Sequence, residues 1–369
     1  MELHMLFLIT LGTIAVLALL YRRQALRDVT YEREFSTGSA YEGDSIEMIE
    51  RIGNRKLLPL PWLRLESLLS GRLVFERQAS LDIRSGDILQ NHISLFSLRP
   101  YKLITRRHRV RCAARGWYRL ESATMTAGDP FGLMNVSKRC PLSLQLLVYP
   151  KPLPMSELPL PSHSWLGDIT VRRWMMEDPF LTTGTREYRP GDSFRSVNWK
   201  ATARTGELQV HKRDYTADHR LWIVLNVEVS ESMWKQVTDP PRIERAIRYA
   251  ASVAHYALGV GVNTGFLSNG WVADCTLKWP VREEPGGGTE QLKTLLDSMA
   301  KLELESVMSF PELLRCELDA GTQGADFLLI TCHTDGGMDL VIDELRRRGN
   351  GVEIMYVPGG EGTRDAASS

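Results

Sequence analysis

GTREYRPGDSFRSVNWKATARTGELQVHKRD, residues 184–214, is the densest mixture of charged, aromatic and turn residues in the chain. Its Pro-Gly-Asp segment, residues 190–192, predicts a tight turn, because proline presets φ and glycine readily adopts a positive φ. The pattern before this central stretch is typical of a membrane anchor and a β domain. The pattern after it is typical of an α/β domain.

A short helix is expected directly after that turn. Asp192 is placed to cap its first turn and Gly206 to end it. Phe194, Val197 and Ala201 would form its one apolar stripe. A strand at 208–211 follows. We interpret the balanced charges around the helix as a partly buried set of ion pairs at a domain junction; a charged helix with a solvated face is the alternative.

The residues from Arg186 to Leu208 follow the pattern R-E-Y-x-x-G-D-x-x-R-x-V-N-W-K-x-x-A-R-x-G-x-L. This pattern resembles the signature of a bacterial domain-of-unknown-function family (number fifty-eight) that accompanies MoxR-type AAA+ ATPases. The resemblance implies a membrane anchor, a β-sandwich and a von Willebrand factor A-like domain, but no reaction. We expect a structural role for the residues that carry it: Arg186, Tyr188, Gly191, Asp192, Arg195, Asn198, Trp199, Ala203, Arg204 and Gly206.

Composition excludes several classes of protein. The chain has 369 residues, enough for about two domains. Its 45 basic and 45 acidic residues leave no net charge to attract nucleic acid. The cysteines form no C-x-x-C pair, which predicts free thiols in a reducing compartment rather than a disulfide framework or a zinc site. They are Cys112, Cys140, Cys275, Cys316 and Cys332.

An apolar run from Leu3 to Tyr21 opens the chain. It has the length of about 17–25 residues that a helix needs to cross a bilayer. It lacks the basic start and the small-residue cleavage site of a signal peptide. We therefore predict a single transmembrane anchor over residues 1–23 rather than a buried core helix. The positive-inside rule then places the soluble domains in the cytoplasm, because three arginines follow the run: Arg22, Arg23 and Arg27.

Residues 29–150 have the pattern of an antiparallel β-sandwich, with short strands and turn residues at regular intervals. Within them Arg107, Arg109 and Arg111 alternate with other residues, so the three arginines share one face of a strand. That face fits anionic lipid headgroups or an acidic partner, and a solvated sheet face is the alternative. Nucleic acid is not expected there, because few aromatic residues lie nearby.

The second half of the chain begins with residues 151–183. Their proline-rich start predicts an extended connector, and the aromatic residues after it form either a docking segment or packing beneath the central stretch. Residues 215–358 alternate strands and helices, which predicts a doubly wound α/β domain with a parallel sheet covered on both faces. Residues 359–369 are small and polar and are expected to form a flexible tail.

The ligand site of such a sheet lies beyond the carboxyl ends of its strands. The loops predicted there resemble the metal-ion-dependent adhesion site of von Willebrand factor A domains, whose pattern is D-x-S-x-S. By position, Ser230, Ser232 and Thr289 would ligate Mg²⁺ or another divalent cation, while Glu228 and Asp335 would act through water. Glu228 stands where the pattern has Asp, so an occupied site and a degenerate one are both open. In the degenerate case the serines cap or turn into the next segment.

The sequence therefore predicts a cytoplasm-facing, membrane-anchored adaptor that presents its α/β domain to a partner. The resemblance implies a MoxR-type AAA+ ATPase as that partner. No catalytic motif is present, so we do not expect an enzyme. The alternative is an envelope-associated hydrolase that uses Ser232, His333 and Asp335. A purely structural membrane scaffold is a third possibility.

Overall fold

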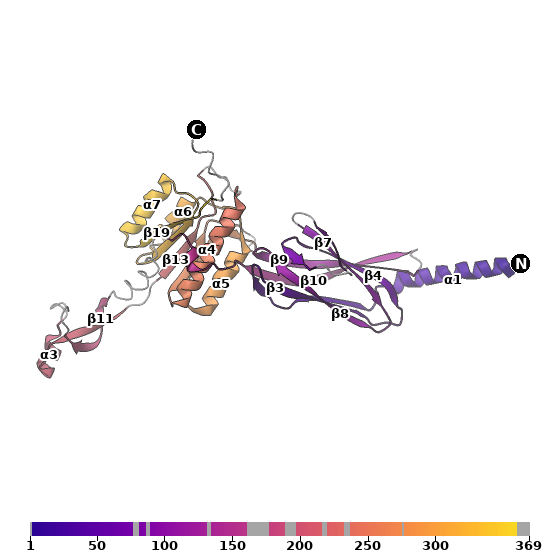
Figure 1. The fold of residues 1–369 in the computed structure, drawn as a ribbon, viewed down its shortest axis with the longest axis horizontal. Coiled ribbons are helices and arrows are strands. Elements are labelled where there is room, and N and C mark those ends of the chain that lie inside the picture. The colour runs from indigo at the N-terminus through magenta and orange to yellow at the C-terminus, as the bar shows by residue number, and fades with distance from the viewer. Residues whose placement is uncertain are drawn as a thin grey trace, which may run out of the picture. The chain divides into compact units, whose positions relative to one another are not determined.

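A computed structural model gives the fold (Figure 1). The described residues are 2–76, 81–85, 89–130, 134–160, 177–188, 197–215, 220–231, 237–274 and 277–359. Two compact units are present. The first comprises Met1–Lys151 and Leu296–Leu302, and the second comprises Pro152–Leu295 and Glu303–Ser369.

Helix α1, Glu2–Gln24, opens the first unit. Its residues from His4 to Gln24 are long and apolar enough to cross a membrane, which confirms the predicted apolar helix and is compatible with membrane anchoring. Most of its side chains are exposed, but Tyr21, and Ala25 directly after the helix, are buried among leucines of the β domain. The hydroxyl of Tyr21 also donates to the backbone oxygen of Pro59, at 3.0 Å. The end of α1 is thus part of a folded core.

The β domain consists of two sheets, with strand orders β1-β3-β8-β5 and β2-β10-β9-β4-β7-β6. Neighbouring strands pair antiparallel, except β2 and β10, which are parallel. Side chains from both sheets share apolar cores. The strands are β1 Val29–Phe35, β2 Ser39–Tyr41, β3 Ser45–Asn54, β4 Leu60–Ser70, β5 Leu73–Phe75, β6 Leu81–Ser85, β7 Leu89–Leu98, β8 Leu103–Cys112, β9 Gly116–Gly128 and β10 Asn135–Tyr149.

The alternation predicted for β8 is confirmed. Arg107, Arg109 and Arg111 are exposed on one face of the strand. The residues between them point into the domain, because successive side chains of a strand lie on opposite faces. The predicted free thiols are also confirmed for the described cysteines, which are Cys112, Cys140, Cys316 and Cys332.

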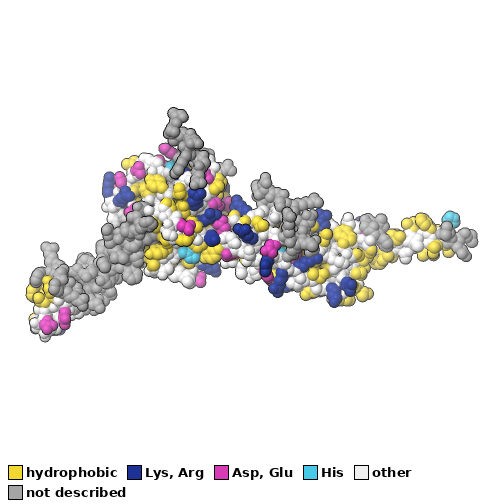
Figure 2. Space-filling model, in the orientation of Figure 1, with side chains coloured by type: hydrophobic (Ala, Val, Ile, Leu, Met, Phe, Trp, Pro, Cys, Tyr) yellow, Lys and Arg dark blue, Asp and Glu magenta, His cyan; other side chains and the backbone are white. Residues whose placement is uncertain are grey.

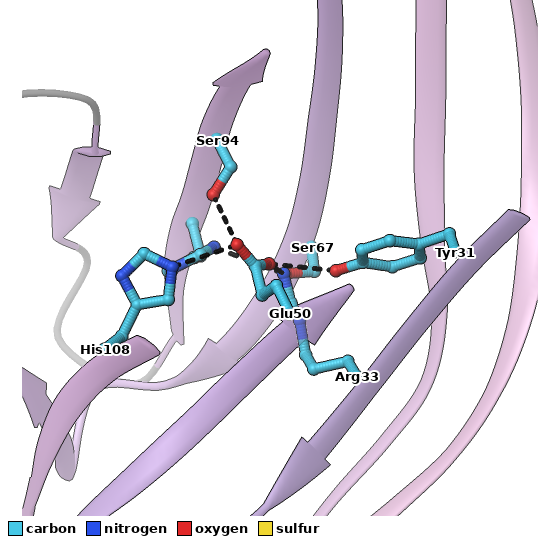
Figure 3. A network of polar contacts seen from close by, with 7 residues as sticks. Tyr31, Arg33, Glu50, Ser67, Ser94 and His108 are labelled. Carbon is cyan, nitrogen blue, oxygen red and sulfur yellow. Dashed lines mark hydrogen bonds and ion pairs between the residues drawn. The ribbon is translucent and has the colours of Figure 1, made fainter. Parts of the chain in front are cut away.

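A buried charged cluster joins the two sheets (Figure 3). Its centre is Glu50 of β3, which is fully buried and forms an ion pair with Arg33 of β1. The other oxygen of Glu50 contacts Nε2 of His108 at 2.9 Å and accepts from Ser94 of β7 at 3.1 Å. Burial alone would raise the pKa of Glu50, but the hydrogen bond from His108 and the charge of Arg33 hold that pKa well below its usual range. The ion pair of Glu50 with Arg33 thus lies within one sheet, and the hydroxyl of Ser94 links the carboxylate to the other sheet.

His92 of β7 belongs to the same cluster. Its Nδ1 lies 3.4 Å from the Arg33 guanidinium, and since arginine can only donate, this nitrogen is the acceptor. Burial, and then the positive charge of Arg33, lowers the pKa of His92 to about 3. The ring is thus neutral at physiological pH.

The central stretch forms a strand pair and a short helix. Strands β11, Glu177–Glu187, and β12, Gln209–Tyr215, pair antiparallel. Helix α3, Trp199–Thr205, begins after Asn198, whose side-chain oxygen accepts from the N–H of Ala201 at 3.0 Å. It ends at Gly206, as predicted, with φ at 79°, a left-handed conformation that favours glycine.

Two expectations for this stretch need correction. Val197 is not helical but forms a β-bridge with Val210, so the described helix is shorter than predicted and its cap is Asn198. Trp199 and Arg204 are exposed. The partly buried ion pairs expected around the helix are therefore not seen at these two residues. Gly191, Asp192 and Arg195 lie outside the described residues, as does the side chain of Arg186.

The α/β domain contains a five-stranded sheet in the order β16-β14-β13-β18-β19. Strands β14, β13, β18 and β19 are parallel, and β16 is antiparallel to β14. Helices α6 and α7 pack on one face, against a core that includes Trp222 and Val224, and α4 and α5 lie on the other face (Figure 1). The elements are β13 Arg220–Leu225, α4 Pro240–Gly259, β14 Asn263–Ser268, β15 Trp271–Val272, β16 Val281–Gly286, α5 Gly288–Lys301, β17 Leu302–Glu303, α6 Phe310–Asp319, β18 Asp326–Thr331, α7 Gly336–Arg347 and β19 Gly351–Tyr356.

The connector before this domain includes a short 3-10 helix, η1, Met155–Glu157. The hairpin expected through Trp271 is formed by the antiparallel pair β14 and β16, and β15, within its connection, pairs with β17. The strand expected to reach Val229 ends at Leu225.

Candidate functional site at the carboxyl edge of the α/β sheet

The carboxyl ends of β13 and β18 meet at the switch point of the sheet. Counted along this domain, the strand order is 3-2-1-4-5, since β13 is the first strand of the sheet and β18 the fourth. Connections leave these two neighbours in opposite directions, so their following loops diverge. Ligands of open α/β sheets bind in such a crevice.

A buried network of polar side chains holds these loops. Asn226, Asn269 and Thr331 follow or end three adjacent strands and are fully buried. The Asn226 amide donates to the Thr331 hydroxyl at 3.0 Å, and its oxygen accepts from the Asn269 amide at 3.2 Å. Asn269 also accepts from the N–H of Val227, at 2.9 Å. Because a buried polar group without a partner is costly, each bond restrains the backbone around it. The edge is therefore a rigid platform.

Both predicted metal-site acids lie at this edge, where each caps a helix. Glu228 accepts from the first N–H of α6, on Phe310, at 3.3 Å. Asp335 accepts from Met338 in the first turn of α7, at 2.8 Å. Burial raises the pKa of Glu228, the bond from Phe310 lowers it, and the charge of Asp335 raises it. The charge of Asp335 thus opposes the ionisation of Glu228.

The structure separates Thr289 from these acids. Strand β16 runs antiparallel, so its last residue, Gly286, pairs with Thr264 at the amino end of β14. Thr289 follows three positions later, in the first turn of α5. It therefore lies at the opposite edge of the sheet. Ser230 is exposed in the loop after β13, and Ser232 lies outside the described residues.

A different loop takes the place expected of Thr289. The N–H of Val307 donates to the backbone oxygen of Asn269 at 2.9 Å, and the Asn269 amide reaches the oxygen of Met308 at 3.4 Å. Residues 304–309 are therefore the third loop of this edge. Sequence reasoning missed it because the loop follows the two-residue strand β17, which is not part of the parallel sheet.

The geometry of the described residues does not assemble the predicted ion site. They contain no group of three or more His, Cys, Asp or Glu side chains that could hold a metal ion. Thr289 is remote, and Glu228 and Asp335 already accept backbone N–H groups. The hydrolase alternative finds little support in this part of the chain: Nδ1 of His333 is buried without a hydrogen-bond partner among the described residues. Both ideas stay predictions.

Exposed apolar side chains surround the rigid platform. Leu277 and Trp279 expose 67% and 68% of their surface in the loop between β14 and β16. This loop is at the carboxyl edge, because Ser268 at the end of β14 pairs with Val281 at the start of β16. Tyr356, also exposed, ends β19 beside Thr331. The apolar residues therefore lie on both sides of the switch point.

Comparisons with known proteins agree with the resemblance in part. Residues 184–309 match the family described as "Protein of unknown function DUF58". Over 307 residues the chain is 21% identical to the uncharacterized protein YeaD of Bacillus subtilis (strain 168), covering 83% of this chain and 71% of that protein. The matched family region includes the central stretch and Glu228, and it ends before α6.

Similar solved structures include a non-cellulosomal cohesin from the archaeon Archaeoglobus fulgidus. That match has 11% identity and a TM-score of 0.22, and it covers 32% of this chain and 91% of the cohesin chain. The major pilin SpaD from Corynebacterium diphtheriae is similar at 10% identity and a TM-score of 0.25, over 30% of this chain and 34% of the pilin chain.

Proposed function

We propose that this chain is a membrane-anchored interaction protein whose α/β domain binds a partner protein at the carboxyl edge of its sheet. The observation that carries the proposal is the set of exposed Leu277, Trp279 and Tyr356 around a rigid polar platform. Large aromatic side chains are enriched among the residues that dominate protein interfaces. A rigid base lowers the ordering cost of binding, because the loops do not have to be fixed by the partner.

The partner in this proposal is a MoxR-type AAA+ ATPase, carried over from the sequence resemblance. The α/β domain faces the cytoplasm, because Arg22, Arg23 and Arg27 follow the apolar helix. We also propose that this domain is von Willebrand factor A-like, which the doubly wound strand order supports. A bound Mg²⁺ ion is not needed for the contact that we propose.

Capture of the purified ATPase by the full-length chain in detergent tests the binding face. Trp279→Ala and Tyr356→Ala should weaken capture, by about 30-fold for a residue at the centre of the interface. Trp199→Ala is a matched control, since Trp199 is 66% exposed but belongs to α3. Capture that depends on Trp199 and ignores the other two would move the site to the central stretch.

The same capture experiment in the presence of a chelator distinguishes an interface completed by a metal ion from one that binds by shape alone. If a divalent ion completes the contact, chelation and Ser230→Ala should both weaken capture. If the contact is built by shape alone, neither should matter. Failure of the ATPase to bind the unmodified chain in either buffer would contradict the proposed partner.

A further inference from the structure

The end of the β domain next to α1 has an unusual surface. Leu57, Tyr101 and Leu103 expose 74%, 69% and 65% of their surface there. Basic side chains surround them. The exposed basic residues of this end are Arg22, Arg23, Arg27, Arg55, Arg99 and Lys102. Within 22–28, 55–59 and 99–103 the sequence has one acid, Asp28. Figure 2 shows yellow and dark blue side chains together at this end of the domain.

Strand register places these loops at the same end as the helix. Strand β1 follows α1 directly and starts opposite Asn54, at the end of β3. Strand β8 starts opposite Gly53, and β7 ends opposite Leu60. The side chain of Asn54 donates to the backbone oxygens of Leu58 and Arg99, at 2.9 and 3.2 Å, which ties the two loops together. We call residues 55–59 and 99–103 the helix-end surface.

Contacts with α1 and with the turn after it fix the level of this surface along the helix. Lys56 Nζ donates to the backbone oxygens of Ala25 and Arg27, at 2.8 and 2.7 Å. Tyr21 donates to Pro59. A hydrocarbon core about 30 Å thick takes about 20 helical residues at 1.5 Å each. The span that starts at His4 therefore leaves the core near Arg23. Loop 55–59 touches the helix at that level.

We propose that the helix-end surface rests on anionic lipid headgroups and sets the β domain against the bilayer. This inference rests on the proposed membrane anchoring by α1. The apolar side chains would enter the headgroup region, where tyrosine is favoured, while the basic side chains meet lipid phosphates. An acidic protein partner fits less well, because the level of the loops on α1 leaves lipid as their neighbour.

The backbone of Tyr101 gives independent support. Its φ is 53°, and Asp28, in the turn after α1, has φ of 55°; these are the non-glycine residues with positive φ in the described chain. Such conformations cost free energy and persist where the surroundings impose them. Here two of them shape the same end of the domain. The turn holds a large aromatic side chain away from the protein core.

Hydrogen exchange of the full-length chain tests the proposal. Peptides from the helix-end surface are compared in detergent, in phosphatidylcholine nanodiscs and in nanodiscs that also contain phosphatidylglycerol. Exchange should be about fivefold slower or more in the anionic nanodiscs, since each basic side chain near such a surface strengthens binding about fivefold. High salt should reverse the effect. Lys102→Glu should reduce it, and Arg109→Glu, on the outer face of β8, should not.

The outcomes separate this inference from the anchoring on which it rests. If alkaline carbonate extracts the chain from membranes, α1 does not anchor it and the proposed function itself fails. If the chain resists extraction but the loops exchange equally in detergent and anionic lipid, the surface proposal is wrong and the anchor stands. Equal protection by soluble polyglutamate would assign the surface to an acidic protein instead and overturn the lipid contact.

Discussion

Substitution of His92 should change the acid stability of the β domain. In the folded chain burial and Arg33 lower the pKa of His92 to about 3, whereas an unfolded histidine has a pKa of about 6.5. As the pH falls below about 6.5, the unfolded chain binds a proton there and the folded chain does not. The free energy of unfolding therefore decreases, by up to about 1.4 kcal/mol per pH unit, until the folded pKa is reached.

The window from pH 7 to pH 5 isolates this effect. His92 contributes a loss of about 2 kcal/mol across it. Glu50 contributes little there, because its pKa is lowered in the folded state, and the stability that it provides is lost only as the pH falls further. His92→Asn removes the titration and keeps an oxygen close to the position of Nδ1, where it can accept from Arg33.

The assay is hydrogen exchange of peptides from β3 and β7 in the full-length chain, corrected for the intrinsic rate at each pH. The unmodified chain should lose protection between pH 7 and pH 5, and His92→Asn should show a flatter profile even if its stability at pH 7 is lower. His255→Asn is a matched control, because His255 also has a lowered pKa but belongs to α4. Equal slopes for His92→Asn and the unmodified chain would refute the reasoning.

Other substitutions test the remaining clusters. Glu50→Gln leaves Arg33 buried without its counter-charge, so the free energy of unfolding, read from the same peptides, should fall by about 3–5 kcal/mol. A change under about 1 kcal/mol, typical of a solvated pair, would contradict the role of this buried ion pair. Glu228→Gln keeps an acceptor for the first N–H of α6 and removes the repulsion of the neighbouring acid, so thermal stability in metal-free buffer should be equal or higher. A clear decrease in the melting temperature would count against that interpretation. Asn198→Ala removes the cap of α3 and should lower the stability of that helix by about 1 kcal/mol, so its amides should exchange faster. Trp199→Ala should leave the exchange unchanged.

Periodic features of the sequence predicted the structure well. The apolar run gave α1, the alternation of residues 107–112 gave the two faces of β8, and alternating strands and helices gave the α/β sheet. Glu50 was missed although a signal was present. Glu50 shares the buried face of β3 with Met48 and Ile52. An acid on such a face predicts a buried partner.

The candidate site was harder to predict because its geometry depends on strand direction. The sequence placed Thr289 near Glu228 on the assumption that the strand before it was parallel. Reversal of β16 moves Thr289 to the other edge. Nor does any local pattern connect Asn226 with Asn269, since 43 positions separate them and only the pairing of β13 with β14 brings them together.

The burial of the end of α1 has a practical consequence for soluble fragments. Ala18, Tyr21, Ala25 and Leu26 are buried, and the last three lie in one apolar core with Leu60, Leu63 and Leu65. A truncation at the predicted boundary, after residue 23, would delete Tyr21 and open that core to water, which favours aggregation. A fragment that begins before Ala18 keeps these buried side chains. The few exposed apolar residues that remain are the smaller liability, so helix α1 is best shortened rather than removed.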